Sequence, residues 1–171
     1  MCCFRRKYVD WRIRKVNVAR SKRFPDMESS LSVCVLFRTK DVSDEAFAEM
    51  DGLLNRKFKT VRYVVLRQRK DLAEYLSGVT SFSRKDTFFG KPSQWIVDDF
   101  LSHKDDLLID LTLKESLPLK YLVGVSAAAC KCGLTKTGYG SYDFEIRNLQ
   151  SVSSLDLLGC VLKYLEMIKN K

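Results

Sequence analysis

The chain contains a single histidine, His103, and this limits the nucleophilic chemistry that its 171 residues can support. Catalysis by a Ser-His-Asp or Cys-His arrangement needs an imidazole as the base. His103 follows an apolar segment and precedes the charged residues 104–106, a setting typical of the solvated end of a helix. The sequence therefore identifies no catalytic residue, and a non-enzymatic protein is the favoured interpretation.

The six cysteines, at positions 2, 3, 34, 130, 132 and 160, lack the density and the short-chain context of a disulfide framework. Cys130 and Cys132 fall near a predicted helix end, where side chains at positions i and i+2 do not face each other. No second cysteine pair and no histidine has the spacing of a structural zinc site. We expect free thiols that pack in the interior, no metal site and no cofactor.

The first predicted strand is followed by RTKD (38–41) and not by a glycine-rich phosphate loop. Asp110 interrupts an apolar strand, and a carboxylate inside a sheet is either paired, with a lysine or a helix end, or functional. In a doubly wound sheet a ligand binds beyond the carboxyl ends of the strands where the strand order reverses. An enzyme or nucleotide-binding protein would have its site there. The residues that this crevice would collect are Thr39, Lys40, Asp110, Thr112 and Lys114.

The net charge of +9 is concentrated at one end of the chain. Residues 1–25 hold nine Lys and Arg side chains and one acid, whereas the remaining residues are nearly neutral. Basic residues mixed with Tyr8 and Trp11 suit phosphate contacts with stacking, or an anionic membrane interface. We predict that this segment binds an anionic partner, which would be nucleic acid, the ribosome or a membrane surface. The residues expected to carry the binding are Arg5, Arg6, Lys7, Trp11, Arg12, Arg14 and Lys15.

Two alternatives remain for the basic segment. It could be a solvated charged arm, or a helix that packs back on the sheet and buries Tyr8 and Trp11 as core. No run reaches the roughly 20 apolar residues that a membrane-spanning helix needs, and the N-terminus lacks the apolar core of a secretory signal. We expect a cytoplasmic protein that is either soluble or peripheral to a membrane.

Helices and strands alternate along the chain and must position these residues. Apolar, β-branched runs predict strands over 31–39, 60–68 and 105–113, with a shorter edge strand over 142–147. Helical spacing and capping residues predict helices over 4–23, 43–56 and 71–76, and further helices that begin at Pro92, at Ser116 (ending at Gly133) and at Ser153. Segments 77–90 and 134–141 are expected to be loops.

This alternation predicts an α/β fold with three layers: a mostly parallel four-stranded sheet of order 2-1-3-4, with helices on both faces. A basic N-terminal helix precedes it. The expected domain organisation is a basic helix or arm over 1–25 and a single α/β domain over 26–171. The length of the chain fits one such domain.

Several short motifs lie along residues 31–170: SRKD (83–86), FGKP (89–92), DLLI (106–109), DFEI (143–146) and LKYL (162–165), with Ser126, Ala128, Lys131 and Gly133 between them. Taken in this order, they resemble an uncharacterised Bacteroidota family, a domain of unknown function. The resemblance implies a bacterial cytosolic protein and brings no activity, cofactor or catalytic residue.

Lys131 lies in the C-terminal part of the predicted helix that ends at Gly133, where a cation meets the helix dipole favourably. In that role it contributes no more than about 1 kcal/mol, which is then the expected cost of Lys131→Ala.

Overall fold

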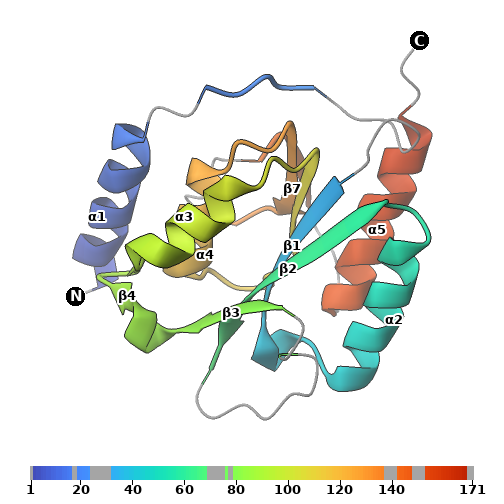
Figure 1. Cartoon of the computed structure of the whole chain (residues 1–171), viewed down its shortest axis with the longest axis horizontal. Coiled ribbons are helices and arrows are strands. Elements are labelled where there is room, and N and C mark those ends of the chain that lie inside the picture. Colours follow the sequence, from blue (N-terminus) through green and yellow to red (C-terminus); the bar gives the residue numbers. More distant parts are fainter. Residues whose placement is uncertain are drawn as a thin grey trace.

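The computed structural model describes residues 2–16, 19–23, 32–68, 76, 79–136, 142–147 and 153–168, which form a sheet covered by helices on both faces (Figure 1). Most of the predicted helix over 71–76, most of the predicted loop over 134–141 and the predicted boundary between residues 25 and 26 lie outside the described residues. Within the described part, no helix has the length and apolar character needed to cross a membrane.

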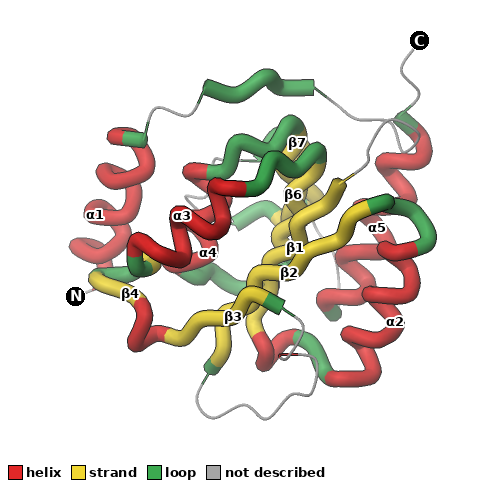
Figure 2. Tube along the Cα trace, viewed as in Figure 1, coloured by secondary structure: helices red, strands yellow, loops and turns green. Residues whose placement is uncertain are grey.

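The strands lie at the centre of the fold, between helices (Figure 2). Six of them form one sheet, and all of its strand pairings are parallel. Its order is β3-β2-β1-β6-β7-β8. The strands are β1 Ser32–Arg38, β2 Thr60–Arg67, β3 Thr80–Ser83, β6 Leu107–Asp110, β7 Cys130–Leu134 and β8 Phe144–Ile146. A separate antiparallel hairpin joins β4 Thr87–Phe88 to β5 Lys91–Pro92. The strand order reverses between β1 and β6.

The helices cover the two faces of the sheet in separate groups (Figure 1). α2 (Asp44–Asn55) and α5 (Ser154–Met167) pack on one face, and α3 (Gln94–Ser102) and α4 (Leu117–Val125) pack on the other. α1 (Cys2–Lys15) lies outside α4. Two short 3₁₀ helices, η1 (Thr39–Asp41) and η3 (Arg84–Asp86), follow β1 and β3.

The central strands are apolar throughout because both of their faces are buried. In β1, Val35 belongs to the core under α2 and α5, whereas Leu36 belongs to the core under α3 and α4. Capping side chains fix where two helices begin. The Ser43 hydroxyl accepts a hydrogen bond from the Ala46 amide at the start of α2, and Ser153 forms a capping box with Asp156 before α5.

α1 is held against α4 by close apolar packing and by one buried charge. Val9 is fully buried, and a side chain at Gly124 would place its Cβ 2.6 Å from Ile13 Cδ1. The ammonium group of Lys120, which is 2% exposed, lies 2.6 Å from an Asp10 carboxylate oxygen. The absent side chain at Gly124 is therefore what lets the two helices approach.

Gly124→Ala is expected to destabilise the protein by about 1–3 kcal/mol, because the added methyl group overlaps Ile13. Chemical denaturation measures this loss. Gly159→Ala is the matched control: it also lies inside a helix, but an added Cβ there meets nothing within 4 Å, so it should stabilise by about 0.5–1 kcal/mol. Equal gains in stability for both variants would show that α1 does not rest on Gly124.

The prediction of four strands is wrong, because the sheet has six. The four predicted strands keep their relative order, but β7 lies between the last two and β3 forms the far edge. β3 falls in the segment 77–90 that was expected to be a loop; its sequence, TSFS, has one large apolar side chain, Phe82, which is fully buried. Pairing with β2 supplies the strand character that the polar sequence does not indicate.

The predicted helix that continues to Gly133 is also wrong, because α4 ends at Val125 and Cys130–Leu134 form β7. On a strand, unlike a helix, residues i and i+2 face the same side. Cys130 and Cys132 accordingly lie together in the core, with their sulfur atoms 3.8 Å apart. Lys131 points to the opposite face and is 4% exposed, so it is a buried lysine on a strand and not part of the predicted helix.

The predicted helix over 4–23 is present over Cys2–Lys15, and the described residues 19–23 are not helical. The contacts of Arg20 explain why residues 19–23 are not helical. Its guanidinium donates to the carbonyl oxygens of Ala128 at 2.6 Å and Ala129 at 3.1 Å, and it also binds the carboxylate of Asp143. The chain after α1 is thus held in a non-helical path beside β7 and β8.

Candidate functional site

A cavity of about 750 Å³ opens at the carboxyl edge of the sheet, on the side of α4. The chain passes from β1 outward to β2 and β3 and returns to β6 on the other side of β1, so this edge contains the point where the strand order reverses. The cavity wall draws on α1, the end of β1, η3 and the first turn of α4. Contributing residues from these elements include Arg5, Arg6, Arg38, Arg84, Ser116 and Leu117.

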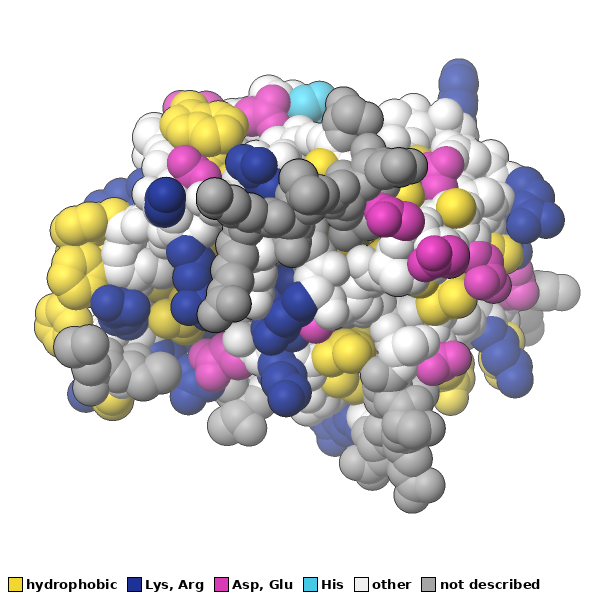
Figure 3. Space-filling model, turned by 90° about the horizontal axis from the view of Figure 1, so that it is seen from below, with side chains coloured by type: hydrophobic (Ala, Val, Ile, Leu, Met, Phe, Trp, Pro, Cys, Tyr) yellow, Lys and Arg dark blue, Asp and Glu magenta, His cyan; other side chains and the backbone are white. Residues whose placement is uncertain are grey.

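Positive charge predominates around this cavity. Among the described residues that line it, there are four arginines and one acid, Glu115. Arg6 binds Glu115 through two hydrogen bonds of 2.9 and 2.7 Å, and Arg38 binds Asp41 through two of 2.6 and 3.0 Å. Figure 3 views the molecule from this edge and shows Lys and Arg side chains on the side of α1 and toward the centre, with further Lys and Arg side chains on the side of α2 and α5 and Asp and Glu side chains on both sides.

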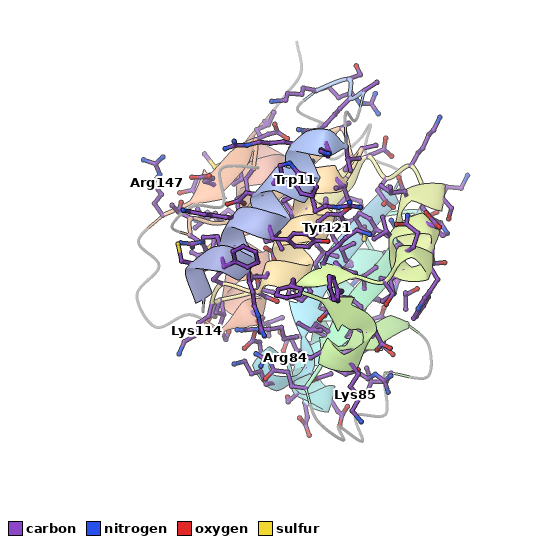
Figure 4. The ribbon with its side chains drawn as sticks, turned by 90° about the vertical axis from the view of Figure 1, so that its left-hand side faces the viewer. Trp11, Arg84, Lys85, Lys114, Tyr121 and Arg147 are labelled. Atoms are coloured by element: carbon purple, nitrogen blue, oxygen red, sulfur yellow. The ribbon has the colours of Figure 1, made fainter. Side chains whose placement is uncertain are left out.

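Arg5 and Arg84 form no ion pair with any of the residues that the structure describes. Both side chains are exposed, and they reach the cavity from α1 and η3 respectively. Figure 4 shows Arg84 and Lys114 at the end of the molecule toward which the N-terminal end of α1 points. Among the described residues, the cavity therefore has arginines from two different elements that no carboxylate neutralises.

A cluster of exposed aromatic rings adjoins the cavity. Phe4 is 66% exposed, Phe88 67%, Trp11 46% and Phe89 41%, and Tyr8 contacts three of these four rings. Phe4 and Phe89 meet edge to face with ring centres 6.0 Å apart. These five residues are called the aromatic cluster below. Hydrophobic side chains gather at the α1 side of the molecule in Figure 3.

Cations cover the faces of two rings in the aromatic cluster. The Lys15 ammonium lies 4.2 Å from the centre of the Trp11 ring, and the Arg5 guanidinium lies 5.9 Å from the centre of the Phe89 ring. Burial lowers the pKa of Lys91 on the neighbouring β5, and the positive charge of Arg12 lowers it further. The aromatic cluster thus lies within a positively charged surface.

The β4–β5 hairpin presents Phe88 and Phe89 through a tight two-residue turn. Phe89 and Gly90 both have positive φ, 50° and 92°, as this kind of hairpin turn requires. A Cβ at Gly90 would lie 2.9 Å from Leu117 Cβ, so the turn is pressed against the start of α4. A bulky residue with positive φ is uncommon and costs free energy. The fold therefore holds Phe89 at the surface in an unfavourable backbone conformation.

The residues predicted to bind a ligand lie outside this cavity. Asp110 and Thr112 come together in a buried network: Asp110 Oδ1 accepts hydrogen bonds from the Thr112 amide at 2.9 Å and hydroxyl at 2.6 Å. Asp110 Oδ2 accepts from Lys136 Nζ at 2.9 Å and from the Tyr142 hydroxyl. All the acceptor positions of this carboxylate are engaged by groups of the chain itself. Asp110 and Lys136 thus form an ion pair within the fold.

The other predicted ligand residues are separate from that network. Thr39 is 8% exposed in η1, and its hydroxyl accepts a hydrogen bond from the Gln68 amide at 3.1 Å. Lys40 and Lys114 are exposed. The described residues hold no group of three or more His, Cys, Asp and Glu side chains that could bind a metal ion.

Of the residues predicted to bind an anionic partner, the structure brings several to one surface. Arg5 and Arg6 line the cavity, Arg12 and Lys15 contact Trp11, and Lys7 and Arg14 are exposed on the same helix. Sequence reasoning missed Arg84, Phe88 and Phe89. The signal for the two phenylalanines was the run TFFG (87–90), in which they precede a glycine in a polar segment.

The model of a family described as a family of unknown function (DUF6913) matches residues 3–168. Comparison with curated proteins and with solved structures gave no match. The match extends from α1 to α5.

Proposed function

Because the chain belongs to this family of unknown function, which brings it no activity, we propose a function from its surface: a non-enzymatic module that binds an anionic membrane surface. It would act as a peripheral cytoplasmic protein. The observation that carries the proposal is the aromatic cluster, exposed at the side of α1 and surrounded by Lys and Arg side chains.

Exposed Phe and Trp rings beside basic side chains suit the headgroup region of an anionic bilayer. The rings enter the boundary between headgroups and acyl chains, and the cations bind the negative surface. Burying one Phe side chain contributes about 1.5–3 kcal/mol, and each Lys or Arg near an anionic leaflet contributes about 1 kcal/mol. Phe4 and Phe88, each about two-thirds exposed, are the rings with most surface to bury.

Nucleic acid is the less favoured partner because base stacking needs open ring faces. The face of Trp11 is covered by Lys15, and that of Phe89 by Arg5. The rings also pack edge to face against one another, Phe88 and Phe89 with ring centres 4.7 Å apart. We propose that α1 is part of the folded module and not an arm that extends from it, since Val9 is buried and Ile13 fills the space at Gly124.

Cosedimentation with phosphatidylcholine vesicles, with and without phosphatidylserine, tests the proposal. The wild-type chain is expected to bind only the vesicles with phosphatidylserine and to be released by salt. Phe4→Ala with Phe88→Ala should weaken binding about tenfold or more, because two exposed rings no longer enter the bilayer. Trp95→Ala is the matched control, since Trp95 is 57% exposed but lies on α3.

Two results would refute the membrane assignment. One is equal weakening by Trp95→Ala and by the double variant, which would mean that any exposed ring contributes. The other is retention on single-stranded RNA, lost in the double variant, with no binding to vesicles; this would assign the same surface to nucleic acid.

A further inference from the structure

We propose that the cavity at the carboxyl edge of the sheet is a binding site for a phosphate-bearing small molecule. The proposal does not depend on membrane binding, because it rests on the cavity and the arginines that line it, and Phe89 is the one residue of the aromatic cluster that it uses. The chemical group that such a site recognises is a phosphate, on a soluble metabolite or on a lipid headgroup.

The lining of the cavity favours an anion. Arg5 and Arg84 face it from two different elements and, within the described residues, neither has a carboxylate partner. The single lining acid, Glu115, is already held by both arms of the Arg6 guanidinium. A guanidinium matches two phosphate oxygens at once, so arginines that line one cavity from two different elements, without a carboxylate partner among the described residues, are suited to binding a phosphate there.

A more buried arginine, Arg38, also lines the cavity. Arg38 is 4% exposed at the end of β1, and its ion pair with Asp41 holds the guanidinium in place. The cation is thereby oriented before any ligand arrives, which lowers the entropic cost of binding. Arg38 reaches this position because β1 ends at the edge where the order of strands reverses.

The remaining wall of the cavity is apolar, and the cavity volume limits the size of the ligand. Leu66, Leu117, Pro118 and the Phe89 ring line the cavity beside the arginines. Its volume of about 750 Å³ lies within the range of roughly 300–1,000 Å³ found for small-molecule sites. A phosphorylated molecule of nucleotide size, with an apolar or planar portion against Phe89 and Leu117, fits both walls.

Titration calorimetry of the full chain with inorganic pyrophosphate tests the site. Saturable binding of one pyrophosphate per chain is expected, and Arg84→Gln should weaken it about tenfold, the effect of losing one charge-assisted contact. Lys85→Gln is the matched control, because Lys85 is the exposed neighbour of Arg84 but does not line the cavity. The Phe4→Ala, Phe88→Ala double variant should bind pyrophosphate as the wild type does, which separates this site from the membrane surface.

Absence of saturable pyrophosphate binding would overturn the proposal, as would equal weakening by Arg84→Gln and Lys85→Gln. A second measurement identifies the source of the phosphate, using vesicles that contain phosphatidylinositol 4-phosphate. If pyrophosphate displaces the protein from these vesicles but not from vesicles with phosphatidylserine, the site takes a lipid headgroup. If it binds in solution without displacing the protein, the site takes a soluble ligand.

Discussion

Replacement of Asp110 by asparagine is expected to lower the free energy of unfolding by about 3–5 kcal/mol. The carboxylate is fully buried, and the Lys136 side chain that it binds is 5% exposed. Removing the negative charge leaves the Lys136 ammonium in the interior without its counter-ion, and an uncompensated buried charge is among the most costly single changes.

Urea denaturation of Asp110→Asn measures this loss. Adding Lys136→Met should recover much of it, because the double variant buries no unpaired charge. Glu166→Gln is the matched control: the Lys57–Glu166 pair is partly exposed, 31% and 49%, so its loss should cost no more than about 1 kcal/mol. A cost below about 1 kcal/mol for Asp110→Asn would show that the network does not stabilise the fold.

Stability should rise with pH above neutrality because of Lys131. Burial, followed by the charges of Arg20 and Lys22, lowers the pKa of Lys131 from 10.5 to about 7. Its ammonium donates a hydrogen bond to the Val123 carbonyl oxygen at 2.7 Å. Between the folded and unfolded pKa values the unfolded chain binds more protons, so raising the pH favours the folded state; below the folded pKa both states are protonated and the dependence ends.

The expected gain from pH 7 to pH 9 is about 2 kcal/mol in the free energy of unfolding. Denaturation of the wild type and of Lys131→Met across this range isolates it, because the titration of every other group is common to both chains. The difference in stability between the two chains should shift in favour of the wild type as pH rises. A constant difference would mean that Lys131 keeps an ordinary pKa in the folded protein.

The sequence predicts the centre of this fold better than its edges. β1, β2 and β6 are recognisable because strands buried on both faces need continuous apolar residues. β7 has the sequence CKCGL, in which a lysine and a glycine conceal a buried strand. Lys131 tolerates that position because the end of α4 supplies the Val123 carbonyl oxygen, a contact that exists only after the chain has folded.

The candidate site was predictable in part. A concentration of arginines at one end of the chain is visible by counting, and Arg5 and Arg6 do line the cavity. The partners of these residues come from distant segments: Arg84 follows β3, and Phe89 lies in the hairpin. Asp110 attracted notice as a polar residue in an apolar strand, but Lys136 and Tyr142 neutralise and cover it. Local sequence shows which residues carry charge and not which of them remain unpaired.

The docking of α1 also has a consequence for synthesis on the ribosome. Arg6 and its partner Glu115 are 109 residues apart in the sequence, and Gly124, which receives Ile13, comes later still. Chains are made from the N-terminus, and contacts between distant segments form late. The most basic segment therefore emerges well before α4 and is among the last to find its place. Until α4 has left the exit tunnel, a nascent chain exposes Val9 and the arginines of α1 together.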